Sequence, residues 1–137
     1  PKPSLINAKN LGLRILLAED NPISMKVIEN IVAKAGCTYE STFNGQDVIE
    51  SAGAQKFDLI LMDFHMPAIS GIDAATIIRQ GSGPNKDRPI YGISADLIER
   101  SIEYSDKAGM NGYLMKHFII EEVYKVLMKI RDDKEKA

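Results

Sequence analysis

Five short segments along the chain have the character of β-strands. Runs of four to eight residues that are apolar or rich in β-branched and aromatic side chains, and that are bounded by turn residues, are typical of strands. These segments are Arg14–Ala18, Thr38–Thr42, Asp58–Met62, Pro89–Ser94 and Gly112–Met115. The third contains the continuous apolar run Leu59–Met62, which predicts a strand buried on both faces, as in a parallel sheet.

Between these strands, apolar residues recur at the spacing of amphipathic helices. The first predicted helix has Asn21 as its N-cap, Pro22 at its first position and Gly36 at its end. The others are predicted over Gln46–Ala52, Gly71–Arg79, Leu97–Ala108 and Ile119–Ile130. The pattern of the second is the weakest, because Gly53 interrupts it.

Strict alternation of strands and helices predicts an α/β fold. Right-handed crossovers between parallel strands place helices on both faces of the sheet. We therefore expect a flavodoxin-like (βα)5 three-layer sandwich with the strand order 2-1-3-4-5. Residues 13–131 would form this domain, residues 1–12 a linker or N-terminal arm, and residues 132–137 a charged tail that frays into solvent.

Composition narrows the classes of partner and the compartment. The formal net charge of -2 gives this domain no electrostatic reason to contact nucleic acid or an anionic membrane. The single cysteine, Cys37, excludes an internal disulfide and fits a reducing compartment. No segment approaches the roughly 20 apolar residues of a membrane span. We therefore expect a cytoplasmic domain.

Ionisable and polar residues follow the carboxyl ends of four predicted strands. Glu19 and Asp20 follow the first, Asp63 the third, Ser94 ends the fourth, and Lys116 follows the fifth. Because parallel strands end at the same edge of a sheet, we expect these side chains to meet there, where open α/β sheets bind ligands. Each residue alone has a simpler explanation as a helix cap, a turn former or a solvated side chain. Their conjunction favours a functional site.

The chemistry of this set is coherent for phosphoryl transfer. Three carboxylates repel one another unless a cation is present, and carboxylate oxygens suit a hard cation such as Mg²⁺, or Mn²⁺. Asp63 would then supply the nucleophilic oxygen, Ser94 a hydrogen bond to the transferred group, and Lys116 a neutralising charge.

The chain resembles the receiver domains of two-component response regulators, most of all those of hybrid sensor histidine kinases. The resemblance covers about Leu13 to Ile130. The stretches that carry it are Ile15–Pro22, Leu59–Pro67 with Gly71, Ile93–Ala95 and Ala108–Lys116. It implies a phosphorylation switch that acts on its own aspartate and is not an enzyme for a diffusing substrate. The domain would stand alone or form the cytosolic part of a longer, membrane-bound hybrid kinase.

The resemblance also implies a role for each residue at the metal. Asp63 would accept a phosphoryl group from a phosphohistidine of a sensor histidine kinase or a histidine phosphotransfer protein. Asp20 would bind Mg²⁺ directly, Glu19 through water, and the backbone carbonyl of His65 would complete the protein ligands. Receiver dimerisation is a further expectation for this family.

Other positions would transmit or tune the signal. Ser94 and Lys116 would contact the phosphoryl group, and Tyr113 would change rotamer with the hydroxyl of Ser94. The output surface would be the Leu97–Ala108 helix, the fifth strand and the last helix. His65, Asp96 and His117 are candidates for tuning the lifetime of the acyl phosphate.

One position departs from the family pattern. Family members usually have a Lys-Pro pair, often joined by a cis bond, where this chain has Lys116-His117. A cis bond costs about 2.5–4 kcal/mol before a residue other than proline. We therefore expect a trans bond, and either a rebuilt loop that moves the ammonium of Lys116 away or a loop that adapts so that Lys116 still reaches Asp63.

Other functions remain to be weighed against the switch. A receiver fold could serve only as a phosphorylation-independent docking module. An FMN-binding flavodoxin is disfavoured because Glu19 and Asp20 would repel its phosphate. A phosphatase of the haloacid-dehalogenase kind would need a second Asp where this chain has His65.

Overall fold

The computed structural model describes residues 10–95, 103, 105–116 and 120–136. Within this part of the chain, parallel strands form one sheet in the order β2-β1-β3-β4-β5, as predicted. The strands are β1 (Arg14–Ala18), β2 (Thr38–Thr42), β3 (Leu59–Asp63), β4 (Ile90–Ser94) and β5 (Gly112–Met115). The helices are α1 (Pro22–Lys34), α2 (Gly45–Ala54), α3 (Gly71–Gln80) and α5 (Ile120–Lys136). Of the predicted helix Leu97–Ala108, the structure describes helical residues 103 and 105–107.

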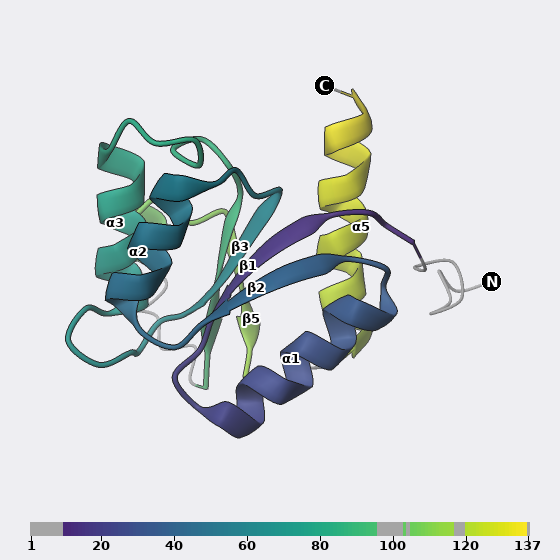
Figure 1. The fold of residues 1–137 in the computed structure, drawn as a ribbon, viewed down its shortest axis with the longest axis horizontal. Helices are drawn as coiled ribbons and strands as arrows, with labels where there is room; N and C mark the ends of the chain where they lie inside the picture. The colour runs from purple at the N-terminus through teal and green to yellow at the C-terminus, as the bar shows by residue number, and fades with distance from the viewer. Residues whose placement is uncertain (1–9, 96–102, 104, 117–119, 137) are drawn as a thin grey trace.

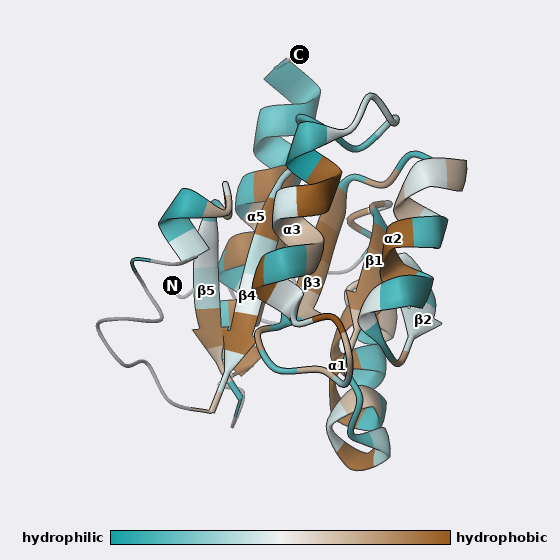
Figure 2. Ribbon diagram, turned by 90° about the vertical axis from the view of Figure 1, so that its left-hand side faces the viewer, coloured by the Kyte–Doolittle hydropathy of each residue, from teal (hydrophilic) through white to brown (hydrophobic). Residues whose placement is uncertain are grey.

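The sheet is the middle of three layers. Figure 1 shows α1 and α5 against one face and α2 and α3 against the other, which confirms the predicted sandwich. Successive residues of a strand point to opposite faces, so the central strands supply two separate cores. Leu17 and Leu61 pack with α1 and α5, whereas Leu16 and Ile60 pack with α2 and α3. All four are fully buried, and Figure 2 shows the central strands as largely apolar.

Local signals place the start of α1 at the predicted residue. The side-chain oxygen of Asn21 accepts hydrogen bonds from the backbone N–H groups of Ile23 and Ser24, and Pro22 occupies the first turn, where its missing N–H costs nothing. Gly36 follows the helix with a φ of 76°, a conformation that favours glycine. These caps therefore fix the residue at which α1 begins after the carboxyl end of β1.

Several element boundaries differ from the prediction by one or two residues, among them those of β3 and α2. The third strand ends at Asp63, because Asp63 still pairs in register with Ile93 of β4. Helix α2 begins at Gly45 and continues through Gly53, where an added Cβ would meet no atom within 4 Å. Its earlier start follows from Asn44, whose side chain accepts a hydrogen bond from the N–H of Asp47 and caps the helix.

Both predicted terminal segments contribute more structure than expected. Leu11, assigned to the linker, is only 6% exposed in the core, and its N–H donates to the carbonyl of Ala35 at 2.9 Å. Helix α5 continues to Lys136 through the segment expected to fray. The ammonium of Lys134 lies 3.2 Å from the carboxylate of Asp58, which attaches the last turns of α5 to the edge where β3 begins.

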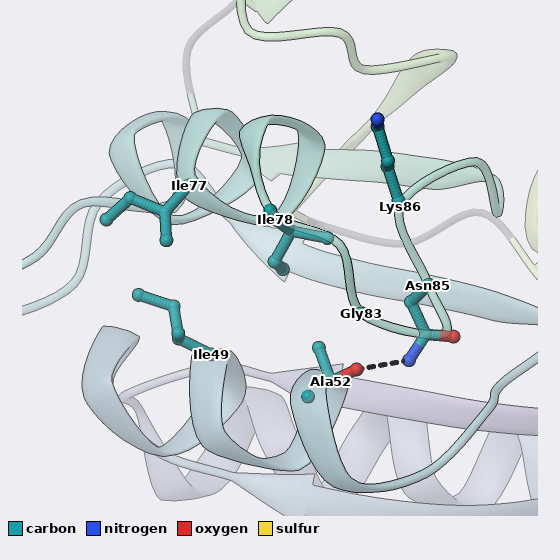
Figure 3. Close-up of a pocket in the computed structure, with 9 residues that line it drawn as sticks. Ile49, Ala52, Ile77, Ile78, Gly83, Asn85 and Lys86 are labelled. Atoms are coloured by element: carbon teal, nitrogen blue, oxygen red, sulfur yellow. Dashed lines mark hydrogen bonds between the residues drawn. The ribbon is translucent and has the colours of Figure 1, made fainter.

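Buried Asn85 joins the loops at the opposite edge of the sheet from the strand carboxyl ends. Its side chain donates to the carbonyls of Ala52 and Gln55, both at 2.6 Å, and accepts from the N–H of Phe57 at 2.8 Å. Figure 3 shows it beside a cavity of about 170 Å³ between α2 and α3. Among the described residues that line this cavity, Lys86 is the ionisable one, and none is a carboxylate, histidine or cysteine.

Replacing Asn85 should destabilise the fold. Asn85→Ala leaves two carbonyls and one N–H without partners in a buried position, so we expect the free energy of unfolding to fall by about 2–3 kcal/mol. Urea unfolding followed by circular dichroism measures this change. Asn30→Ala, at an exposed position of α1, is the control and should change stability by less than about 0.5 kcal/mol. Equal effects of the two substitutions would contradict the assigned role.

Candidate functional site

The register of the sheet gathers the predicted site at one edge. Ala18 of β1 pairs with Met62 of β3, so Glu19 and Asp63, the next residue of each strand, lie side by side. Ser94 ends the neighbouring strand β4. The backbone N–H of Lys116 donates to the carbonyl of Ser94 at 2.8 Å, which extends the pairing of β4 and β5 by one residue.

Three carboxylates meet there. One oxygen from each of Glu19, Asp20 and Asp63 lies within 4.8 Å of the other two. Glu19 and Asp63 are each 1% exposed, whereas Asp20 faces solvent. Two of the three acids are buried and the third is exposed, so the cluster reaches solvent through Asp20.

Lys116 connects the two buried acids. Its Nζ lies 2.8 Å from Oδ2 of Asp63 and 3.3 Å from Oε1 of Glu19. Burial lowers the pKa of Lys116, but the hydrogen bond and charge of Asp63, together with the charge of Glu19, outweigh burial and raise it overall. The ammonium therefore stays protonated, and the second of the two sequence alternatives, in which Lys116 reaches Asp63, is the one observed. The bond between Lys116 and His117 lies outside the described residues.

Glu19 carries an electrostatic penalty that Lys116 does not remove. Its pKa is raised from 4.5 to about 7. Burial is the largest cause; the backbone N–H of Asn21 lowers the pKa, the hydrogen bond and charge of Asp63 raise it, and the charge of Lys116 lowers it. Oε2 accepts from the N–H of Asn21 at 3.0 Å. Among the described residues, Oε1 of Glu19 is the buried side-chain oxygen without a hydrogen bond.

Backbone contacts hold Asp63 in place. The N–H of His65 donates to Oδ1 of Asp63 at 3.1 Å. At Gly71, the first residue of α3, an added Cβ would lie 1.8 Å from the carbonyl oxygen of Asp63, so only glycine allows this approach. The intervening loop turns sharply at Ala68, whose φ is 65°, and the N–H of Ile69 donates to the carbonyl of Pro67.

The donor set fits a hard divalent cation. The oxygens of Glu19, Asp20 and Asp63 are the type of ligand that Mg²⁺ and Mn²⁺ prefer, and an open, solvent-facing side leaves room for the waters that Mg²⁺ retains. Oε1 of Glu19 points the same way, because this buried oxygen has the ion pair with Lys116 but no hydrogen bond, and a bound cation would satisfy it further.

Of the other predicted site residues, the structure describes three, and their exposure differs. Ser94 is 1% exposed at the end of β4, and Tyr113 is 37% exposed on β5, where it pairs with Gly92. His65 faces solvent next to Asp63, and its carbonyl as a metal ligand stays a prediction. Asp96 and His117 lie outside the described residues.

Comparison with known proteins decides the family. The pattern of the response regulator receiver domain matches residues 15–128. The chain belongs to the response regulator receiver domain family. This confirms the resemblance seen in the sequence, and it fits the receiver topology of the sheet.

Relatives of this receiver domain are parts of much longer proteins. Hybrid signal transduction histidine kinase G of Dictyostelium discoideum is 31% identical over 117 residues, which cover 84% of this chain and 3% of that protein. Transcription factor SKN7 of Saccharomyces cerevisiae is 27% identical over 123 residues, covering 90% of this chain and 19% of that protein. The chain therefore spans less than a fifth of the length of either relative.

Solved structures agree with the fold. The receiver domain of a sensor histidine kinase from Pseudomonas aeruginosa PAO1 matches with a TM-score of 0.81 and 33% identity, covering 88% of this chain and 98% of that one. That structure has a magnesium ion coordinated in its active-site cleft. The chemotaxis protein CheY4 of Vibrio cholerae also has a TM-score of 0.81, with 23% identity over 87% of this chain and 98% of that one, and shows the fold alone.

Sequence reasoning missed the residues that support the receiver's acids through the backbone. The carbonyl of buried Thr42 accepts from the N–H of Glu19 at 3.1 Å, and the hydroxyl of Thr42 donates to the carbonyl of Leu17 at 2.7 Å. Asn21, predicted only as a helix cap, also donates its N–H to Glu19. The threonine at the end of an edge strand gives no local signal of this role.

The raised pKa of Glu19 predicts a pH-dependent stability of the metal-free domain. The folded state binds this proton more tightly than the unfolded state, so the stability that Glu19 contributes is present below its unfolded pKa and is lost as the pH rises through about 7. Relative to Glu19→Gln, the wild type should therefore lose free energy of unfolding from about pH 5 to about pH 8.

Urea unfolding in a chelator at several pH values measures this difference. Glu122→Gln, at an exposed position of α5, is the control and should differ from the wild type by the same amount at every pH. Added Mg²⁺ should stabilise the wild type most at the alkaline end, where Glu19 is ionised. Parallel pH profiles for wild type and Glu19→Gln would show that Glu19 does not carry the penalty.

Proposed function

We propose that this receiver domain accepts a phosphoryl group on Asp63 from a phosphohistidine of a sensor histidine kinase or a histidine phosphotransfer protein. The observation that carries the proposal is the contact of Lys116 with Asp63 at 2.8 Å inside a cluster of three acids. A bound Mg²⁺ or Mn²⁺, held by Glu19, Asp20, Asp63 and the His65 carbonyl, would supply charge neutralisation for the phosphoryl oxygens.

The transfer needs a free, ionised carboxylate oxygen. An oxygen of Asp63 forms a bond to phosphorus while the phosphorus–nitrogen bond of the phosphohistidine breaks, and the electron pair of that bond returns to the imidazole. Asp63 is suited to this because Lys116 and the N–H of His65 hold its carboxylate in one orientation. Lys116 also balances the charge that the phosphoryl group brings.

The modified aspartate would then bias the far surface of the domain. Ser94 ends the strand next to Asp63, and Tyr113 lies on the following strand, so a shift of the Ser94 hydroxyl toward the phosphoryl group can pass to Tyr113. The output surface would comprise residues 97–108, β5 and α5. His65, Asp96 and His117 would set how long the acyl phosphate survives hydrolysis. The domain would act on itself and would not turn over a diffusing substrate.

Exposed apolar residues beside the acids offer a surface to the phosphohistidine protein. Ile23 in the first turn of α1 is 78% exposed, Val27 in the next turn 44%, and Ile120 at the start of α5 44%. Ile120 and Val27 border one cavity of about 270 Å³. Because α1 begins directly after Glu19 and Asp20, this surface continues from the acid cluster, and a partner seated on it can present its phosphohistidine to Asp63.

A docking module that needs no phosphorylation is the rival function, and the complete acid cluster with its lysine disfavours it.

Among the described helices, none combines the length and apolar character needed to cross a bilayer. We propose a cytosolic domain that works within a longer hybrid kinase or as a separate receiver, with receiver dimers as a further form and no nucleic acid bound by the domain itself.

Acetyl phosphate tests the acceptor directly, because it donates its phosphoryl group with acetate as the leaving group. The wild type with Mg²⁺ should gain one phosphoryl group, and Asp63→Asn or the removal of Mg²⁺ should lower labelling at least about 100-fold. Intact-protein mass spectrometry reads the product. Asp133→Asn, on α5 away from the acids, should label normally. Labelling that survives Asp63→Asn, or a wild type that neither labels nor binds beryllofluoride with Mg²⁺, would refute the proposal.

The docking surface is tested by comparing two donors. Ile120→Asp should slow transfer from a phosphorylated histidine phosphotransfer protein by about tenfold or more, because it places a charge in an apolar contact. Its labelling by acetyl phosphate should change little. Ile77→Asp on α3 is a matched control, because Ile77 is also an isoleucine that is 44% exposed. Equal slowing by both substitutions, or slowing with both donors alike, would contradict the assigned surface.

A further inference from the structure

The side chain of Phe64, the residue after Asp63, occupies the space that a side chain at position 92 would fill. Phe64 is fully buried. An added Cβ at Gly92 would lie 1.8 Å from Cε1 of its ring and 2.7 Å from Cδ1. Gly92 has no left-handed backbone conformation to explain it, since its φ is not among the positive ones. The ring of Phe64 therefore requires a residue without a side chain at position 92, in the middle of β4.

Three contacts hold the backbone at Asp63 and Phe64. Its N–H donates to the carbonyl of Ile93 on β4 at 2.8 Å, and its carbonyl accepts from the N–H of Gly71 at 2.9 Å. Gly71 also packs against the carbonyl of Asp63. A displacement of the Phe64 ring cannot be absorbed by a free loop, because the backbone on both sides of residue 64 is held. The part of a displacement that the side-chain torsions of Phe64 do not take up would act on the peptide between Asp63 and Phe64.

Gly92 lies on the same strand as Ser94, the predicted site residue at the end of β4. Residues two apart on a strand face the same side of the sheet, so Gly92 and Ser94 share one face of β4. The Phe64 ring lies on that face at Gly92, two residues before Ser94. The ring therefore packs between the strand end that carries Asp63 and the strand end that carries Ser94, which are also joined by the pairing of Asp63 with Ile93.

We propose that Phe64 and Gly92 form a positioning pair that sets the distance between Asp63 and Ser94 and so determines the rate of phosphoryl capture. The inference rests on the proposed function of Asp63. Neither residue touches the transferred group, so both act through Asp63. Catalysis by positioning is sensitive to small displacements, and a misplacement of about 1 Å can cost roughly 100-fold in rate.

The test is a double-mutant cycle on the complete chain. Gly92→Ala forces the ring to move, Phe64→Leu removes the ring atoms that the new methyl group would meet, and the double variant restores a filled contact. The rate constant for labelling by acetyl phosphate is measured at saturating Mg²⁺, at a temperature where circular dichroism shows every variant fully folded. Gly53→Ala is the matched control, because an added Cβ there meets no atom within 4 Å.

We expect Gly92→Ala to slow labelling about tenfold or more, Phe64→Leu to slow it a few-fold, and the double variant to return to within about threefold of the wild type. Gly53→Ala should label at the wild-type rate. If the pair serves only core packing, Gly92→Ala lowers the unfolding temperature but labels within twofold of the wild type, which overturns the inference. A double variant whose loss is the product of the two single losses also overturns it.

A failure of the proposed function is distinguishable from a failure of this inference. If the wild type itself takes no phosphoryl group, the acceptor role of Asp63 falls, and the inference falls with it. If the wild type labels and Gly92→Ala labels equally well, Asp63 remains the acceptor and only the positioning pair is refuted. If Gly92→Ala does not fold, the cycle is decided by Phe64→Leu and the double variant: a double variant that labels faster than Phe64→Leu supports the pair, and one that labels no faster refutes it.

Discussion

Burying Glu19 and Asp63 next to each other at one edge of the sheet carries an electrostatic cost, and the ammonium of Lys116 offsets part of it. Lys116 follows β5, an edge strand, whereas Glu19 follows β1 and Asp63 ends β3, both inside the sheet. Contact is possible only if β4 and β5 keep their register with β3. The pairing of five strands is thus a condition for the site, and the remaining negative charge leaves it ready for a cation.

The sequence predicted the strands and the first helix well because their signals are local. Asn21 and Pro22 fix the start of α1 by their own hydrogen-bonding properties, and β1, β2 and β5 have the predicted bounds. The earlier start of α2 follows from its local cap, Asn44, but the wrong boundaries at the two ends of the domain depend on contacts between distant segments. Helix α5 continues beyond its last apolar position, where Lys134 contacts Asp58. Leu11 is buried in the core, and its N–H donates to the carbonyl of Ala35. Neither contact could be inferred from the periodicity of the sequence.

The acids and the lysine could be placed together because parallel strands share one carboxyl edge, and that inference needs only the order of the elements. The residues that hold the acids through backbone contacts could not be predicted in the same way. Thr42 reaches Glu19 from the neighbouring strand, and Gly71 meets the carbonyl of Asp63 at a distance that only the folded backbone defines. Nor could the sequence choose between two positions for Lys116 when proline is absent after it.

The starts of two helices lie at the same edge as the acids. Helix α1 begins three residues after Glu19, and α3 begins at Gly71, in contact with the backbone of Asp63. Aligned peptide dipoles give each helix N-terminus a partial positive charge, which favours a nearby anion by about 0.3–1 kcal/mol. The order of strand and helix in the chain therefore directs two positive dipole ends toward this edge. Negative charge added to Asp63 would enter a field that already favours it.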